Sequence, residues 1–478
     1  MAFELKERKK KTRVVCTIGP ASEDEKMLRK LILAGMNVMR LNFSHGDFEE
    51  HGGRIKTVRK LSKELNKNIA ILLDTKGPEI RTGDFVGGKT EFKKGQGVTI
   101  CQEDIEGTSD RFTITYKELY KDVKPGGFIL VNDGQVELLV DHVEGTDIVC
   151  VCANDGIVKN KRGINVPGVK LGFDYLSPKD TADITFGCEQ GVNFIAASFV
   201  RRAQDVLDVK KLLIENGHPE IQIIAKIENN EGVDNMDEIL KVADGIMVAR
   251  GDLGVEVPAE DVPLIQKKLI KKCRAAGKPV ITATQMLDSM QENPRPTRAE
   301  VSDVANAIYD GTDAIMLSGE SAQGKYPEES VMTMTKIALK TEETLDYASL
   351  LRKAIRTAPE DPSEAICMSV AEIASKFKVS AIVVYTESGS TAKRVSRYRP
   401  ESMIIAATPY EPVTRSLALN WGVKGVVCKR MNDRASQLEY AQILAKENGV
   451  EPGEQILITA GTPGVGGTTS YLELVTVK

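Results

Sequence analysis

The sequence is poor in aromatic residues, in long apolar runs and in net charge. Aromatic residues make up 5% of the 478 residues. No apolar run approaches the roughly 20 residues of a membrane-spanning helix, so the sequence predicts no membrane protein. The 64 Lys and Arg nearly balance 68 Asp and Glu, and the formal charge of -4 gives no global field toward nucleic acid or anionic lipid. We therefore expect a globular protein without either partner.

The eight cysteines form no CxxC pair, which disfavours a zinc site or a redox motif. Cys150 and Cys152 would share one face of a strand, and we interpret them as packed apolar side chains. Behind the basic stretch 6–13, the apolar residues 14–18 are too few for a secretory signal and predict a first strand instead. These features predict a protein of the reducing cytoplasm.

At roughly 150 residues per domain, the length predicts about three domains. From the start to about residue 73, and again from about 175 to 345, short β-branched runs alternate with helical-period segments, as in parallel β/α units. Eight such runs match the strand count of a TIM (β/α)8 barrel, with an open doubly wound sheet as the alternative. The predicted strands are 13–19, 38–44, 68–75, 194–200, 222–228, 245–251, 279–285 and 313–318.

An all-β domain is predicted between the third and fourth barrel strands, because glycines punctuate short alternating runs there. A domain inserted at this loop would lie over the barrel mouth and act as a lid that excludes water. Its antiparallel strands are predicted at 97–102, 128–131, 136–143 and 148–153.

Behind Pro359 and Pro362 the pattern predicts a small open α/β domain. Its helices include 363–378 and 433–448, and its strands are 381–386, 403–409, 425–429, 455–460 and 471–477. The predicted domains are a barrel of 1–75 and 173–345, an inserted lid of 76–172, and a C-terminal domain of 346–478.

Polar residues at the carboxyl ends of the barrel strands predict an active site at the mouth. In the run Lys226-Ile227-Glu228 the lysine and the carboxylate share one strand face, and Asp252 follows the next strand. Two carboxylates beside phosphate oxygens suit Mg2+. The simpler interpretation is a structural salt bridge of Lys226 with either carboxylate.

A second cluster joins Arg40, Asn42 and Ser44 with Asp74 and Thr75. Its amide, hydroxyl and carboxylate oxygens would suit a monovalent cation, and Arg40 would offer forked donors to phosphate, as would Arg81. Polar residues that only cap strand ends explain this set equally well. The cation-site hypothesis is favoured only because this cluster lies next to the first one.

Three further motifs follow predicted strands. Thr284 ends one strand and is a functional candidate, whereas Thr297 and Glu300 have the spacing of a helix capping box. The loop 461–468 has the glycine spacing of a phosphate loop, but Gly467 replaces the lysine, so a nucleoside triphosphatase is disfavoured. The hydroxyl-rich loop 386–391 opens a predicted helix and would either hold a phosphate or cap the helix.

Together these motifs resemble the pyruvate kinase family. The resemblance runs through the predicted barrel in the family's order, and the inserted and C-terminal units match its plan. The stretches that carry it are 16–22, 39–46, 74–81, 226–229, 249–254, 282–287, 294–300 and 316–320.

The resemblance implies transfer of the phosphoryl group of phosphoenolpyruvate to ADP, giving pyruvate and ATP, with Mg2+ (or Mn2+) and K+ as cofactors. It implies a cytoplasmic homotetramer under allosteric control by a phosphorylated effector. Glu79 stands where K+-independent members carry lysine, so K+ dependence is expected. Arg162, in Lys161-Arg162-Gly163, replaces a nucleotide-contacting lysine. The chain also stops before the extra C-terminal domain of some bacterial members.

The site residues implied by the resemblance fall into five groups. They are catalytic Lys226, Thr284 and Arg40; substrate-binding Arg40, Lys226, Gly251, Asp252 and Thr284; nucleotide-binding Asn42, His45, Arg81 and Arg162; Mg2+ ligands Glu228 and Asp252 with K+ ligands Asn42, Ser44, Asp74 and Thr75; and effector-binding Thr386, Ser388, Gly389, Ser390 and Thr391.

Two other functions remain open at this point. A catalytically silent homologue that only binds metabolites would have the same fold, although intact Lys226, Glu228, Asp252 and Thr284 argue against it. A barrel lyase of 2-oxo acids would share the metal carboxylates but need no ADP, so an ADP requirement separates it from a kinase.

Overall fold

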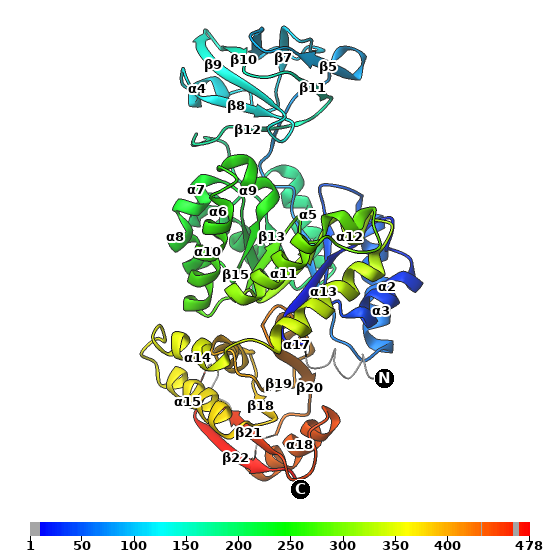
Figure 1. Cartoon of the computed structure of the whole chain (residues 1–478), viewed down its shortest axis with the longest axis vertical. Helices are drawn as coiled ribbons and strands as arrows, with labels where there is room; N and C mark the ends of the chain where they lie inside the picture. Colours follow the sequence, from blue (N-terminus) through cyan, green and yellow to red (C-terminus); the bar gives the residue numbers. More distant parts are fainter. Residues whose placement is uncertain (1–9, 432, 462–467) are drawn as a thin grey trace.

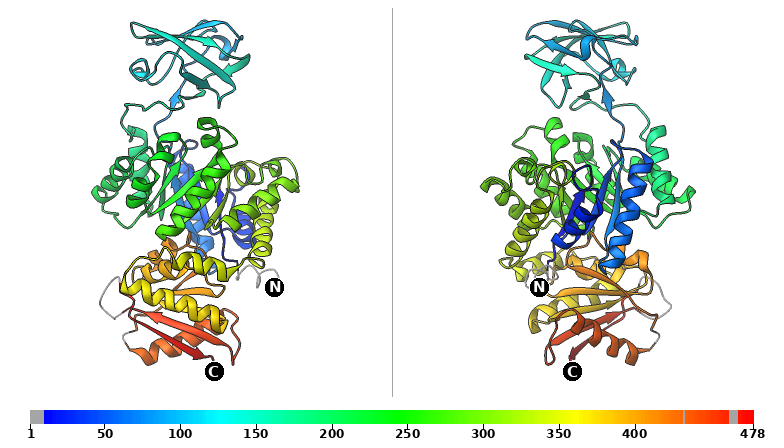
Figure 2. Two further views of the ribbon diagram at one scale, coloured as in Figure 1. Left: turned by 60° about the vertical axis from the view of Figure 1, so that its left-hand side comes forward. Right: turned by 90° about the vertical axis from the view of Figure 1, so that its right-hand side faces the viewer.

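The computed structural model describes residues 10–431, 433–461 and 468–478. Three parts follow one another along the long axis of the molecule, with the inserted β strands at one end, the barrel in the middle and the C-terminal sheet at the other end (Figure 1; Figure 2).

Eight parallel strands close into a barrel in the order β1-β17-β16-β15-β14-β13-β3-β2. This confirms the predicted TIM barrel and excludes the open doubly wound sheet. The strands are β1 (Arg13–Thr17), β2 (Val38–Asn42), β3 (Ala70–Asp74), β13 (Phe194–Ala197), β14 (Gln222–Ile227), β15 (Gly245–Ala249), β16 (Val280–Ala283) and β17 (Ala314–Leu317).

Helices surround the barrel, and several begin at side-chain caps. At the start of α11, Thr297 and Glu300 form the predicted capping box, which satisfies backbone N–H groups that a helix start leaves free. The barrel helices are α2 (Glu25–Ala34), α3 (Phe48–Glu64), α5 (Pro178–Glu189), α6 (Ala203–Glu215), α7 (Asn230–Asp234), α8 (Met236–Val242), α9 (Arg250–Glu256), α10 (Val262–Ala276), α11 (Arg298–Asp310), α12 (Gly319–Ala322) and α13 (Pro327–Glu342), with the 3-10 turn η2 (Asp288–Gln291).

The interior of the barrel is a packed apolar core, because alternate residues of its strands point inward. Leu72, Ile224 and Met247 belong to this core, and Leu419 of the C-terminal part packs into the same cluster. Residues two and four positions further along the same strands therefore face inward at the opposite end. On two of these strands the positions are polar, namely Asp74 beyond Leu72 and Lys226 and Glu228 beyond Ile224, and these side chains lie at the mouth.

The inserted residues form a seven-stranded sheet in the order β4-β12-β8-β9-β10-β6-β7 and a two-stranded sheet of β11 and β5. Most pairs are antiparallel as predicted, but β6 and β7 pair in parallel. The elements are β4 (Ile80–Arg81), η1 (Val86–Gly88), β5 (Lys89–Phe92), β6 (Gly97–Cys101), β7 (Arg111–Thr113), α4 (Leu119–Asp122), β8 (Phe128–Val131), β9 (Val136–Glu144), β10 (Asp147–Cys152), β11 (Gly156–Lys159) and β12 (Gly163–Asn165). We call this unit the inserted domain.

The C-terminal part is a five-stranded sheet in the order β20-β19-β18-β21-β22, with only the last strand antiparallel. This confirms the predicted α/β domain. Its elements are α14 (Tyr347–Ile355), α15 (Pro362–Phe377), β18 (Ala381–Tyr385), α16 (Ser390–Arg397), β19 (Met403–Thr408), α17 (Glu411–Ser416), β20 (Val423–Val427), α18 (Arg434–Glu447), β21 (Gln455–Ala460) and β22 (Tyr471–Thr476).

Most predicted strands match a strand of the structure, but several of their ends are wrong: the strand predicted at 194–200 ends at Ala197, and the strand predicted at 38–44 ends at Asn42. The seventh residue of the predicted strand 245–251 is Gly251, yet the strand ends at Ala249 because α9 begins at Arg250. The predicted strand 425–429 begins two residues earlier, at Val423. Most of the loop 461–468 lies outside the described residues.

Cys150 and Cys152 are buried and unpaired, which agrees with their interpretation as packed apolar side chains. Within the described ranges, no helix is both long enough and apolar enough to cross a membrane.

Candidate active site

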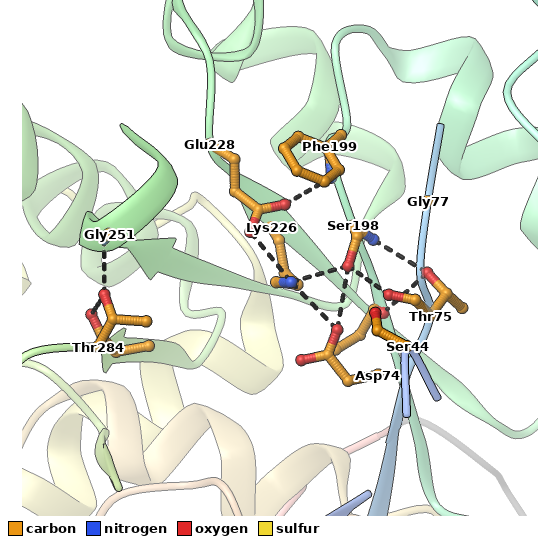
Figure 3. Close-up of polar contacts among 12 residues, drawn as sticks. Ser44, Asp74, Thr75, Gly77, Ser198, Phe199, Lys226, Glu228, Gly251 and Thr284 are labelled. Atoms are coloured by element: carbon orange, nitrogen blue, oxygen red, sulfur yellow. Dashed lines mark hydrogen bonds and ion pairs between the residues drawn. The ribbon is translucent and has the colours of Figure 1, made fainter. Parts of the chain in front are cut away.

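The carboxyl ends of β3, β13 and β14 bring four polar side chains together at the barrel mouth (Figure 3). The Lys226 ammonium lies 3.1 Å from Asp74 Oδ1, 3.0 Å from Glu228 Oε1 and 2.7 Å from the Ser198 hydroxyl oxygen. The side chains of Asp74 and Glu228 are each 1% exposed, and that of Lys226 is 10% exposed. The predicted salt bridge is therefore present, and it joins a larger buried network.

Burial and charge shift the pKa values of this network in different directions. Burial raises the pKa of Glu228 to about 7, and Asp252 adds to the rise while Lys226 opposes it. Burial alone would lower the pKa of Lys226, but the carboxylates of Asp74 and Glu228 outweigh it and hold that pKa above its usual value. The two carboxylates thus favour the charged form of Lys226.

Asp74 also holds Arg40, the second cation at the mouth. Arg40 Nε donates to Asp74 Oδ2 at 2.6 Å, and its Nη1 donates to the Thr17 hydroxyl at 2.8 Å. Burial would raise the pKa of Asp74, yet Arg40 and Lys226 together keep it below its usual value. One buried carboxylate therefore orients two cations, Arg40 at Oδ2 and Lys226 at Oδ1.

Ser198 and Phe199 were missed by the sequence analysis. The Ser198 hydroxyl accepts from Lys226 and donates to the Thr75 carbonyl 2.6 Å away. Phe199 has a φ of +54°, an unfavourable backbone conformation for this residue, and its N–H donates to Glu228 Oε2 at 2.6 Å. The available signal was the polar residue Ser198, two positions beyond the inward-facing Ala196 on a strand already predicted.

Thr284 lies across the mouth from Lys226 (Figure 3). Its φ of +68° and that of Gln285, +51°, place two consecutive non-glycine residues in the left-handed region. Arg250, a polar strand-end residue expected at the mouth but given no role, donates to the Thr284 carbonyl at 2.7 Å and pairs with Asp303 at 2.8 Å. The Gly251 N–H donates to the Thr284 hydroxyl at 2.7 Å, so two neighbouring residues at the start of α9 hold this turn.

The residues predicted to bind K+ lie at the ends of β2 and β3. The Asn42 side-chain oxygen accepts from the Ser44 N–H at 3.1 Å, and the Thr75 hydroxyl accepts from the Ser198 N–H at 3.1 Å. Thr75 is buried, and Asn42 and Ser44 are half-buried. This set offers neutral oxygens next to the single carboxylate of Asp74, which fits a weakly charged cation better than a divalent one.

The predicted nucleotide-binding residues are spread between the mouth and the inserted domain. Arg81 donates from Nε to Glu79 at 2.9 Å and from Nη1 to the Lys161 carbonyl at 2.7 Å. Arg162 is exposed on the adjoining turn, and His45 is exposed in the loop after β2. Arg81 is thus paired with Glu79, whereas Arg162 and His45 face solvent.

A cleft of about 190 Å³ lies between the inserted domain and the barrel, with Ile164 on one side and Asp252 on the other. Asp252 follows Gly251 in α9 and is half-buried. Because the pKa of the buried Glu228 carboxyl rises partly through Asp252, a cation between these two carboxylates would relieve their repulsion. The pair therefore fits a divalent ion.

No group of three His, Cys, Asp or Glu side chains in the described part of the chain is placed to hold a metal ion. An ion at Glu228 and Asp252 would therefore take its other ligands from substrate and water, as Mg2+ commonly does.

The predicted effector residues lie far from the mouth, in the loop between β18 and α16. The Thr386 hydroxyl accepts from the Gly389 N–H at 2.9 Å, and the Ser388 hydroxyl donates to that of Ser390 at 3.2 Å. Thr391 is buried with its hydroxyl 2.9 Å from that of Thr469. These contacts tie the loop together, although α16 begins after Gly389 without a side-chain cap, and Ser388 stays exposed.

Comparison with protein families gives two matches that cover most of the chain. The family model described as pyruvate kinase, barrel domain, matches residues 9–331, and the model described as pyruvate kinase, alpha/beta domain, matches residues 364–475.

Similar proteins extend over nearly the whole chain. A pyruvate kinase of Staphylococcus saprophyticus is 54% identical over 469 residues, which are 97% of this chain and 80% of the relative. A pyruvate kinase of Clostridium acetobutylicum is 51% identical over 471 residues, covering 98% of this chain and 100% of the relative. The crystal structure of a pyruvate kinase from Cryptosporidium parvum has a TM-score of 0.94 at 39% identity, covering 99% of this chain and 97% of that chain.

Proposed function

The chain belongs to the pyruvate kinase family of phosphotransferases, and from this membership we propose that it transfers the phosphoryl group of phosphoenolpyruvate to ADP, giving pyruvate and ATP. The observation that carries the proposal is the buried Lys226 ammonium, held by Asp74 and Glu228 at the barrel mouth. Phosphoryl transfer needs positive charge around the moving group far more than covalent help.

Lys226 and Arg40 are the two cations that face the substrate in this proposal. Lys226 stabilises the charge on the transferring phosphoryl group and on the enolate that remains, and Arg40 binds the substrate phosphate. Both are already oriented by Asp74, so little reorganisation is needed when the substrate binds. Asp252 and the Gly251 backbone also line the substrate site. Thr284 contacts the substrate near the path of proton delivery to the enolate.

Glu228 and Asp252 hold Mg2+ (or Mn2+) in this proposal. Bound there, the ion supplies positive charge next to phosphate oxygens and lowers the charge repulsion between the two reactants. Asn42, Ser44, Asp74 and Thr75 hold K+. The support for both assignments is the chemistry of the donors, two carboxylates for the divalent ion and mostly neutral oxygens for the monovalent one.

The nucleotide phosphates lie against Asn42, His45, Arg81 and Arg162, and the inserted domain closes over them as a lid. Arg162 supports this role because its exposed guanidinium can approach a ligand without breaking an ion pair. Control by a phosphorylated effector at 386–391, the homotetramer, the cytoplasmic location and the predicted domain boundaries stay predictions.

The deciding experiment measures pyruvate formation from phosphoenolpyruvate and ADP with Mg2+, in the presence and in the absence of K+. We expect ADP-dependent pyruvate formation that falls when K+ is removed. Turnover without ADP would favour a lyase. A folded protein that binds Mg2+ and phosphoenolpyruvate without any turnover would favour the silent homologue.

The same assay tests the effector site. A phosphorylated metabolite that binds at 386–391 shifts the half-saturating concentration of phosphoenolpyruvate. If no sugar phosphate or nucleotide shifts it, control through this loop is wrong.

A further inference from the structure

Arg201 connects the barrel to the chain segment that returns from the inserted domain. Its side chain is 6% exposed, and it donates from Nη1 to the Leu171 carbonyl at 3.0 Å and from Nη2 to the Phe173 carbonyl at 3.3 Å. The guanidinium carbon also lies 4.9 Å from the centre of the Phe173 ring, close enough for a cation–π contact. Three contacts therefore hold one segment, Leu171 to Phe173.

The other side of Arg201 is fixed to the barrel. Its backbone N–H donates to Asp205 Oδ2 at 2.9 Å and its Nε to the same oxygen at 3.3 Å. The Asp205 side chain is 1% exposed, and Asn235 donates to the Arg201 carbonyl at 2.9 Å. These partners restrict the Arg201 side chain to one orientation. A movement of the segment 171–173 is therefore passed on to the backbone at Arg201.

Arg201 lies only two and three residues beyond Phe199 and Ser198, which contact the proposed catalytic groups. Ser198 holds Lys226 through its hydroxyl, and the Phe199 N–H holds Glu228. The returning segment also reaches Ser198 directly, because the Tyr175 hydroxyl donates to the Ser198 carbonyl at 2.7 Å. The four residues 198–201 thus contact both the returning segment and the reaction site.

We propose that Arg201 is a positioning residue that couples the inserted domain to Lys226 and Glu228, so that the position of the lid sets the orientation of both side chains. The coupling rests on the proposed function, because it needs the inserted domain to move during turnover. Loss of Arg201 frees the returning segment and loosens residues 198–201. The Phe199 N–H then holds Glu228 less firmly, and the apparent affinity for Mg2+ falls together with kcat.

The test compares Arg201→Met with Arg202→Met in the full-length protein. Arg202 is the matched control, because it also pairs with Asp205, at 3.6 Å, but its side chain is 51% exposed and reaches neither Leu171 nor Phe173. We expect Arg201→Met to lower kcat and raise the half-activating Mg2+ concentration by about tenfold each, the usual size for residues that orient metal ligands. Arg202→Met should stay near the wild-type values.

Arg201→Lys is a second variant, which tests the proposal even if Arg201→Met does not fold. Lysine keeps the charge opposite Asp205 but lacks the planar fork that reaches two carbonyls. We expect an intermediate loss of kcat and faster hydrogen exchange in residues 171–173 and 198–201 at an unchanged melting temperature.

Wild-type kinetics in either lysine or methionine variant would overturn the role of Arg201 while leaving the proposed function intact. An inactive wild-type protein would instead overturn the proposed function itself.

Discussion

The Lys226 ammonium lies 3.1 Å from Asp74 Oδ1, and both side chains are buried at the barrel mouth. The two residues come from strands separated by β13, yet they point to the same place because both occupy inward-facing positions. Asp74 also accepts a hydrogen bond from Arg40 through Oδ2, so a single carboxylate orients two positive charges at the mouth.

Replacing Lys226 by methionine tests whether its charge acts in the transition state. We expect Lys226→Met to lower kcat by at least about 100-fold, as loss of a preorganised electrostatic group does, with a much smaller rise in KM for phosphoenolpyruvate. Steady-state kinetics at saturating ADP measure both constants. Lys271→Met, at a solvent-exposed lysine on α10, is the control, and a near-normal kcat for Lys226→Met contradicts the proposed role.

The pairing of Glu79 with Arg81 bears on the proposed K+ dependence. Arg81 donates to the Glu79 carboxylate from Nε at 2.9 Å, and its Nη2 lies 2.8 Å from the same oxygen. A lysine at this position brings a positive charge that can take over the role of K+. We therefore expect Glu79→Lys to raise the rate measured without K+ by about tenfold, while its rate with K+ changes little.

The control for this charge reversal is Glu91→Lys, because Glu91 is an exposed glutamate of the inserted domain paired with Lys93. It should keep the wild-type K+ dependence. If Glu79→Lys still needs K+ as the wild type does, Glu79 does not set the dependence.

Arg162 stands where the resemblance predicts a nucleotide-contacting lysine. Its exposed guanidinium offers charge-assisted hydrogen bonds to nucleotide phosphates. We expect Arg162→Ala to raise KM for ADP about tenfold, which corresponds to about 1.4 kcal/mol, with KM for phosphoenolpyruvate unchanged. Arg162→Lys should restore part of the affinity, and Lys89→Ala elsewhere on the inserted domain should have no effect. Equal rises in both KM values would point to a disturbed lid instead.

His51 links stability to pH. Its ring is buried, stacks on Phe43 at 4.1 Å and contacts the His45 carbonyl through Nε2 at 2.9 Å. Burial lowers the pKa of His51, and Arg54 and Lys179 lower it further against the opposing effects of the His45 carbonyl and Glu50.

Because the folded protein disfavours the charged ring, the unfolded chain binds the proton more readily. The contribution of His51 to stability is therefore complete above its ordinary pKa of about 6.5 and is lost as the pH falls below it. We expect His51→Gln to lose less stability than the wild type between pH 8 and pH 5, measured by urea unfolding. His142→Gln, at an exposed histidine of the inserted domain, is the control. If His51 did not titrate on unfolding, the stability of His51→Gln would change with pH as that of the wild type does.

Much of the fold followed from the sequence because its signals are local. The alternation of β-branched runs with helical segments predicted the barrel strands, and the loss of that period after residue 75 predicted the inserted domain. The boundary at Gly251 was wrong because α9 begins directly at Arg250, with no polar cap or proline to mark its start.

The residues of the mouth were predictable where a charged side chain stands at an inward-facing position near the end of a predicted strand, as at Lys226, Glu228 and Asp74. The sequence alone therefore determined the elements, their order and the polar ends of the strands. Only the tertiary structure decided that Asp74 serves both Arg40 and Lys226, that Ser198 joins them, and that Arg201 holds the segment returning from the inserted domain. Such contacts join residues far apart in the chain, and their geometry depends on barrel closure, which no local pattern encodes.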